Sequence, residues 1–297
     1  MSFSTEVKNE LCGISMNRVC CTRAEAYGAL LHASVFSHRE IRLSAENAVV
    51  VRRLQALLQR AFFVESEAEK CGRKQQIVID DASRIGRIFD ALGYDRKSHI
   101  TYHLNRNVME EDCCIASFLR GAFLMAGTVA GPDKKSHLEL KSTHQSLVGE
   151  ETSLMLDLGL SPKQAKRANA LLLYFKDGAS VEDFLTRIGA PHAAMELMQA
   201  KVEKNLRNTI NRQVNCETAN LVKAADASAR QIAAIQSVLK GGGEDAFPES
   251  LRETVRLRLR YPTDSLTELA RRFDPPISKP GLSHRLKKIT EFAAKEN

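Results

Sequence analysis

Two segments of the chain share an unusual hydrophobic pattern. "EAYGALLHASVF" (Glu25–Phe36) and "FLRGAFLMAGTV" (Phe118–Val129) are both apolar and helix-like, with a glycine inside and small residues at the end. Glycine in a helix interior costs roughly 1 kcal/mol relative to alanine. Its occurrence in two similar helices, 93 residues apart, indicates an internal repeat.

The polar and apolar pattern after each glycine predicts the same series of elements. After the first come an extended pair (35–44), a helix (46–62), two strands (63–70 and 74–80) and a helix (81–93). After the second come segments 128–142, 144–160, 162–170, 171–178 and 179–190. Period-2 alternation in "KQQIVID" and "SHLELKS" favours strands. We therefore predict an α+β domain over residues 1–190, built from two αββαββα repeats at about 23–93 and 113–190.

A duplicated unit gives the repeated glycine a purpose. If the two copies meet about a pseudo-twofold axis, their first helices (25–34 and 118–127) run side by side at its centre. Gly28 and Gly121, with Ala33 and Ala126 near the helix ends, would then let the backbones approach closely. The alternative is two independent buried helices that each happen to contain glycine.

This pattern resembles the LAGLIDADG homing endonuclease fold, on the residues "YGALLHAS" and "RGAFLMAG" followed by ββαββα. The resemblance implies two sheets that form a saddle on DNA, and a metal-binding carboxylate near the end of each motif helix. Here the corresponding residues are Ala33 and Ala126, and an alanine methyl cannot ligate the divalent cation that phosphodiester hydrolysis requires. His32 is interpreted as a partly buried helix-end histidine and not as a ligand. We expect no catalytic residue, no metal and no cofactor.

The C-terminal third has a different pattern. Residues 191–240 are predicted to form a helical connector, with an apolar stripe that includes Leu206 and Ile210 beside a polar stripe of asparagines. The polar stripe favours a phosphate or partner contact and a plain solvated face about equally. Gly241, Gly242 and Gly243 are predicted to form a linker (241–243). An all-α domain is predicted over 244–297.

Within that domain the pattern predicts a helix-turn-helix. "SLTELARRF" has apolar residues at i, i+3, i+4 and i+7, and Ser265 with Glu268 forms a capping-box pattern. "DPPIS" ends this helix, because prolines cannot continue it. Ser278 is expected to cap a second helix with a core stripe of Leu282, Leu286, Ile289 and Ala293.

The second helix has a basic outer face and is predicted to lie in the major groove of DNA. Lys279, Ser283 and His284 are assigned to base edges or nearby phosphates, and Arg285, Lys287 and Lys288 to phosphates. Arg285 is alternatively suited to a guanine edge. An exposed basic helix that packs on the first domain is the alternative. The predicted DNA-binding set is Ser265, Thr267, Ser278, Lys279, Ser283, His284, Arg285, Lys287 and Lys288.

Composition and charge agree with a nucleic-acid partner. The chain of 297 residues has a net charge of +7, of which +5 lies in residues 191–297. A basic segment favours an acidic partner. The longest apolar runs are far shorter than a membrane span, and the N-terminus lacks a secretion signal, so we expect a cytoplasmic, nucleoid-associated protein without membrane contact. Seven cysteines without CxxC spacing are interpreted as reduced thiols and not as a metal or redox site.

Over its full length the sequence resembles the WhiA family of bacterial regulators. The segments that carry the resemblance are "MSFSTEVKNEL", "SFLRGAFLMAGTV", "NRQVNCETANLVKAADASARQI" and "SLTELARRFDPPISKPGLSHRLKKI". It implies a degenerate LAGLIDADG domain joined to a helix-turn-helix, and a role in transcription control linked to sporulation, or to cell division and chromosome segregation. We expect a monomer that binds double-stranded DNA at promoter regions, with another transcription regulator or RNA polymerase as further partners. The alternatives are a protein-interaction factor whose N-terminal domain binds a partner protein and, third, an active nuclease.

Overall fold

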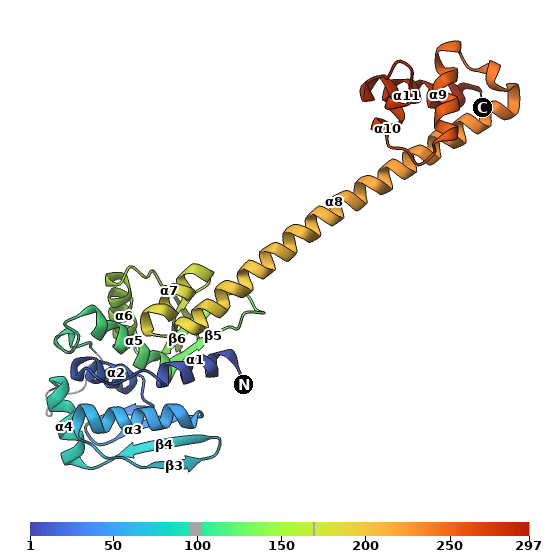
Figure 1. The fold of residues 1–297 in the computed structure, drawn as a ribbon. Helices are drawn as coiled ribbons and strands as arrows, with labels where there is room; N and C mark the ends of the chain where they lie inside the picture. Colours follow the sequence, from blue (N-terminus) through green and yellow to red (C-terminus); the bar gives the residue numbers. More distant parts are fainter. Residues whose placement is uncertain (95–102, 169, 297) are drawn as a thin grey trace. The chain divides into compact units, whose positions relative to one another are not determined.

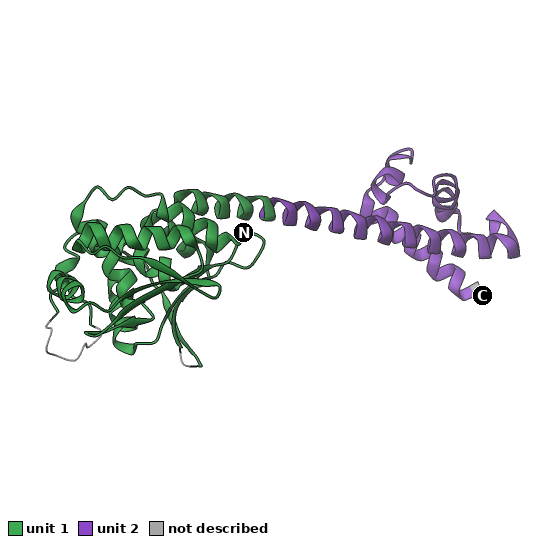
Figure 2. Cartoon of the chain, turned by 90° about the horizontal axis from the view of Figure 1, so that it is seen from below, with its two compact units in different colours: residues 1–204 green, residues 205–297 purple. Residues whose placement is uncertain are grey.

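The computed structural model describes residues 1–94, 103–168 and 170–296, and they form two compact units. Unit 1 comprises residues 1–204 and unit 2 residues 205–297 (Figure 2). Residue 169, in the predicted strand 162–170, and residues 95–102 and 297 lie outside the described residues. No helix in the described ranges is both long and apolar enough to cross a lipid bilayer.

The first repeat of unit 1 contains two strand pairs and three helices. Helix α1 (Phe3–Cys12) precedes it, and the repeat itself consists of α2 (Val19–Leu31), β1 (Val35–Phe36), β2 (Ile41–Ala45), α3 (Ala48–Phe62), β3 (Ala68–Cys71), β4 (Lys74–Ile79) and α4 (Ala82–Leu92). The strands form an antiparallel sheet in the order β1-β2-β4-β3. Ile41 pairs with Ile79 and Leu43 with Ile77, so one apolar face of the sheet is buried.

The second repeat follows the same plan. A short 3-10 helix, η1 (Arg106–Val108), leads to α5 (Asp112–Ala126), β5 (Gly127–Val129), β6 (Leu138–Ser142), α6 (Gln145–Asp157), β7 (Lys163–Arg167), β8 (Ala170–Phe175) and α7 (Gly178–Ile188). Its sheet order is β5-β6-β8-β7, the counterpart of the first sheet. Figure 1 draws the first repeat in blue to teal and the second in green to yellow. The predicted duplicated αββαββα fold is therefore confirmed, although both motif helices begin six residues before their predicted starts.

Helices α2 and α5 pack against each other at the centre of unit 1, and two glycines lie in their contact. A Cβ on Gly28 would lie 2.9 Å from the carbonyl carbon of Phe118 and would overlap its oxygen. A Cβ on Gly121 would meet the backbone of Glu25 and Ala29 in the same way, 2.9 Å from the Ala29 nitrogen. Each helix therefore presents a glycine to the backbone of the other, which brings the two axes closer than any side chain would permit.

The N-terminal segment anchors the start of the long helix α8 (Pro191–Gly242). Ser2 caps α1 by accepting a hydrogen bond from the Thr5 amide. At the other end of α1, the Glu10 carboxylate accepts hydrogen bonds from the amides of His192 (2.8 Å) and Ala193 (3.0 Å). A carboxylate at a helix N-terminus satisfies free amides and complements the helix dipole.

Unit 2 contains the rest of α8, the 3-10 helix η2 (Glu244–Ala246), α9 (Glu249–Arg260), α10 (Leu266–Arg271) and α11 (Lys279–Glu296). Ile235 and Val238 of α8 are buried in the same core as Leu251 and Val255 of α9 and Leu282 of α11. The C-terminal domain thus includes the last part of α8.

The predicted domain boundaries differ from this arrangement. The sequence predicts a connector over 191–240 and a linker over 241–243, but α8 continues through Gly241 and Gly242 and turns at Gly243, whose φ is +67°. Glycine lowers helix propensity without forbidding a helix, and here apolar side chains of the preceding turns are held in the core of unit 2. A domain that began at residue 244 would lack Ile235 and Val238.

Candidate nucleic-acid interface

Helix α10 owes its start to a capping box. The Ser265 hydroxyl accepts a hydrogen bond from the Glu268 amide (3.3 Å), and the Glu268 carboxylate accepts one from the Ser265 amide (2.9 Å). These bonds satisfy amides that a helix N-terminus leaves free. They also lower the pKa of Glu268, since the charged carboxylate is the better acceptor.

Helix α11 begins at a second cap and follows a tight turn. The Ser278 hydroxyl accepts a hydrogen bond from the Gly281 amide at 3.2 Å, and the Ile277 amide donates to the Ala270 carbonyl at 3.1 Å. The predicted stripe of α11 is buried in the core of unit 2, at Leu282, Leu286, Ile289 and Ala293. The opposite face of α11 is consequently left to solvent.

That outer face carries most of the residues assigned to DNA. Eight of the nine predicted residues are exposed: Lys279, Ser283, His284, Lys287 and Lys288 on α11, Ser278 at its cap, and Ser265 and Thr267 at the start of α10. Arg285 is half-buried, with its guanidinium 5.5 Å from the centre of the Phe273 ring. Lys287 lies 3.6 Å from Glu291 one turn later, a weak exposed pair that a phosphate can replace.

Three arginines near α10 differ in how firmly they are held. Arg258 is buried and donates to the Asp264 carbonyl at 3.0 Å; burial lowers its pKa, against the opposing effect of Asp264. Arg272 Nε lies 2.5 Å from the Asp264 carboxylate, and the guanidinium carbon of Arg272 lies 3.7 Å from the centre of the Tyr261 ring. Arg271 is exposed and makes no ion pair with any described residue. Sequence reasoning missed Arg271 because the adjacent arginines of "ARRF" are indistinguishable until the fold assigns one to Asp264.

In unit 1, the ends of the two motif helices meet at a cavity of about 350 Å³. Ala126 ends α5, and Ala33 follows the C-cap of α2; both line this cavity, as do Lys141, Thr143 and His144. None of its described lining residues is an aspartate or glutamate. The donors present are therefore cationic or neutral, a set that does not suit a hard divalent cation.

A buried ion pair lies beside this cavity. His32 Nε2 is 2.7 Å from the Glu151 carboxylate of α6, and the two side chains are 2% and 1% exposed. Burial opposes the protonated form of His32, but Glu151 and the Lys141 carbonyl outweigh it and raise the pKa of His32. His32 is thus more deeply buried than the sequence suggested, and it joins the two repeats.

The raised pKa of His32 predicts a pH-dependent stability. The contribution of the protonated side chain is complete below the unfolded pKa of about 6.5 and is lost as the pH rises through the higher pKa of the folded state. The stability advantage of the wild type over His32→Gln should therefore shrink above about pH 6.5, as measured by calorimetry across a pH series.

His144 provides a control of opposite sign. Burial, together with the nearby charge of His32, lowers the pKa of His144. The free energy of unfolding of a variant with a neutral residue at position 144 should therefore rise relative to that of the wild type as the pH falls. Equal pH profiles for the wild type and His32→Gln would contradict the assigned ion pair.

Comparison with known proteins places this geometry in a family. Residues 115–207 match the WhiA LAGLIDADG-like domain, and residues 210–293 match the WhiA C-terminal HTH domain. The "Probable cell division protein WhiA" of Ruminiclostridium cellulolyticum is 36% identical, covering 99% of this chain and 97% of its own length. The protein of the same name from Alkaliphilus metalliredigens is 35% identical over 100% and 98%. The chain belongs to the WhiA family.

A solved structure supports the same fold. Full-length DUF199/WhiA from Thermatoga maritima matches with a TM-score of 0.61 and 24% identity, over 99% of each chain. The two WhiA domain matches meet between residues 207 and 210, close to the division between units 1 and 2. The WhiA HTH match includes the last part of α8, as does the core of unit 2.

Proposed function

We propose that this protein is a DNA-binding transcription regulator that acts in cell division through the helix-turn-helix of unit 2. The observation that supports this most directly is α11, which buries its apolar stripe and leaves Lys279, His284, Lys287 and Lys288 exposed. The relatives are named probable cell division proteins, which supports a role of this protein in cell division. Links to sporulation and chromosome segregation, and a nucleoid location in the cytoplasm, are part of the same proposal.

In this proposal α11 enters the major groove with its N-terminal residues at the bases. Lys279, Ser283 and His284 contact base edges or nearby phosphates, and Lys287 and Lys288 contact phosphates. Arg271 adds a cation at the end of α10. Arg285 rests against Phe273 and contacts a phosphate or a guanine edge from the side of the helix.

Neutral substitution of two lysines tests the proposal. Lys287→Ala with Lys288→Ala should weaken binding of the full chain to promoter DNA at least about tenfold and lower the slope of log K against log salt by about 1.8. The measurement is fluorescence anisotropy across a salt series. The matched control is Lys223→Ala with Lys240→Ala, which removes two exposed lysines of α8 in the same unit. Equal losses in both pairs, or none in either, would refute the assignment of α11.

The nuclease alternative receives no support at the motif ends. Ala33 and Ala126 stand where the homing endonuclease resemblance places carboxylates, and the described lining of their cavity has no acid. Incubation of the protein with magnesium and duplex DNA, followed by gel electrophoresis, separates the two functions: cleavage would favour the nuclease.

Partner binding is favoured by one specific feature of unit 2. Leu206, Ile210, Val214 and Leu221 of α8 are 51–71% exposed, an apolar series at helical spacing. Such a surface suits a protein partner such as another regulator or RNA polymerase. In the alternative the N-terminal domain binds that partner, and the described residues of unit 1 also expose large apolar side chains, among them Phe63 (75%), Val19 (66%) and Leu156 (54%). Light scattering measures whether the stripe instead joins two copies of the chain, a result that would contradict the predicted monomer. Co-elution of RNA polymerase with the wild type but not with Ile210→Glu would support partner binding.

A further inference from the structure

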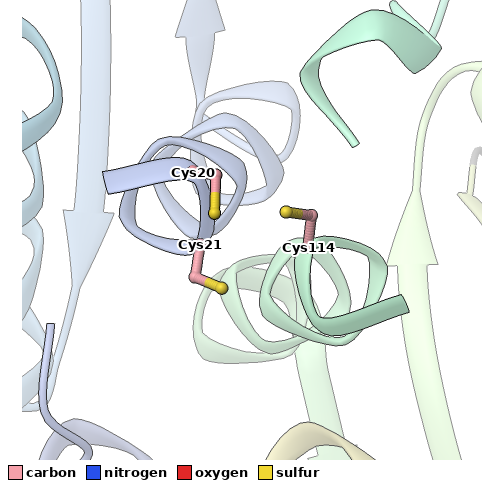
Figure 3. A group of neighbouring side chains, drawn as sticks. All are labelled: Cys20, Cys21 and Cys114. Atoms are coloured by element: carbon pink, nitrogen blue, oxygen red, sulfur yellow. The ribbon is translucent and has the colours of Figure 1, made fainter. Parts of the chain in front are cut away.

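Three cysteine side chains converge where α2 and α5 begin. Cys20 and Cys21 lie in the first turn of α2, and Cys114 lies in the first turn of α5. Their three Sγ atoms lie within 4.8 Å of one another. The sulfur of Cys114 points toward the sulfur of Cys20 across the space between the two helices (Figure 3).

The pseudo-twofold arrangement explains this convergence. Cys20 and Cys21 are offset from Cys113 and Cys114 by the same 93 residues that separate Gly28 from Gly121. Sequence spacing alone gave two vicinal pairs that suit no metal, but the helix pairing brings both pairs to one place. Cys113 lies at the edge of the group, with its carbonyl 3.7 Å from Cys21 Sγ and its own sulfur 3.2 Å from Arg18 Nη1.

The spacing of the sulfurs fits a thiolate-bound metal ion. Zinc–sulfur bonds of about 2.3 Å place the sulfurs about 3.8–4.0 Å apart, so rotations of the three side chains are sufficient to close the site. Thiolates select soft cations. The amino ends of α2 and α5 and the Arg18 guanidinium carry positive charge, which offsets that of three thiolates. Cys20 is exposed and gives the ion access, and Cys114 is buried.

We propose that Cys20, Cys21 and Cys114 bind one zinc ion, which ties the amino end of α2 to that of α5. Each thiol loses its proton to solvent as its sulfur–zinc bond forms, and water occupies the fourth position on the exposed side. The site lies in unit 1 and is independent of the proposed DNA contacts. Its role is to stabilise the pairing of the two repeats.

The test uses the reduced full-length protein, freed of metal, and zinc alone as the probe. Competition with a chromophoric chelator should show one tight equivalent in the wild type and at least tenfold weaker binding in Cys20→Ser. Cys20 is exposed, so this variant should keep its fold, which circular dichroism checks. Cys71→Ser and Cys216→Ser, both exposed cysteines outside the group, serve as matched controls and should bind as the wild type does.

A stability measurement gives an independent readout. Zinc at 100 times the wild-type Kd should raise the Tm of unit 1 by roughly 5–10 °C in the wild type and in Cys71→Ser, and by at most about half as much in Cys20→Ser. Zinc binding no tighter in the wild type than in Cys20→Ser would overturn the proposal. A Cys20–Cys114 disulfide that forms on mild oxidation in a protein that binds no zinc would overturn it in favour of a redox pair.

Discussion

Replacement of Gly121 by alanine should lower the free energy of unfolding of unit 1 by about 3 kcal/mol or more. The added Cβ overlaps the carbonyl oxygen of Glu25 and lies 2.9 Å from the Ala29 nitrogen. These are backbone atoms of a packed helix and cannot move aside as the end of a side chain can. The axes of α2 and α5 must separate, which opens the apolar contacts along the whole helix pair. Gly28→Ala should act in the same way, against Phe118 and Ala122.

Gly149 in α6 is the matched control for this prediction. It also lies inside a helix, but a Cβ there meets no described atom within 4 Å. Gly149→Ala should therefore stabilise unit 1 by up to about 1 kcal/mol through helix propensity. Calorimetric unfolding of the three variants tests the contrast, and a shift of the same sign for Gly121→Ala and Gly149→Ala would refute the close helix contact.

Removal of the Glu25 charge should destabilise unit 1 by about 3–5 kcal/mol. Glu25 of α2 is 1% exposed and binds two arginines, Arg53 of α3 at 2.7 Å and Arg120 of α5 at 3.0 Å. In Glu25→Gln both guanidiniums stay buried without a counter-charge. Because Arg120 comes from the second repeat, the loss falls on the contact between the repeats. Urea unfolding measures the loss of free energy, and hydrogen exchange at α2 and α5 shows whether the loss falls on this helix pair.

An exposed pair in the same unit provides the control. Asp183 and Arg187 of α7 lie 3.0 Å apart with side chains 45% and 40% exposed, so Asp183→Asn should cost less than about 0.5 kcal/mol.

Replacement of all three buried charges, with Glu25→Leu, Arg53→Met and Arg120→Met, should recover part of the stability lost in Glu25→Gln. Recovery stays partial because Arg53 and Arg120 also donate to the carbonyls of Ile14 and Ile188. A small effect of Glu25→Gln, equal to that of Asp183→Asn, would contradict the buried triad.

The accuracy of sequence reasoning varied with the range of the interactions involved. Local patterns identified the strands of both sheets, the cap at Ser265 and the buried stripe of α11, because each depends on neighbours a few residues away. The connector was predicted less well. Three consecutive glycines usually end a helix, but α8 continues through Gly242 because Ile235 and Val238 are buried against α9 and α11, contacts that no local pattern records.

The candidate sites show the same division. The sequence indicated which face of α11 meets solvent, but it did not show that Arg272 is held by Asp264 and Tyr261 and that Arg271 is exposed. The buried partners of Glu25 and His32 were also absent from the prediction. The ion pairs of Glu25 and His32 join residues 28 or more positions apart along the chain, and a charged residue in a sequence does not reveal which residue it will pair with.

Periodicity and repetition along the chain were enough to establish two copies of one fold and a separate helix-turn-helix, since hydrophobic burial imposes those patterns on any sequence that folds this way. They also predicted a close approach of α2 and α5 at Gly28 and Gly121. Only the tertiary structure decided the rest of that contact: a carboxylate between two arginines, and three sulfurs from two distant segments. The physical reason is that close packing and charge burial depend on distances in space, and those distances arise when α2 and α5 pair.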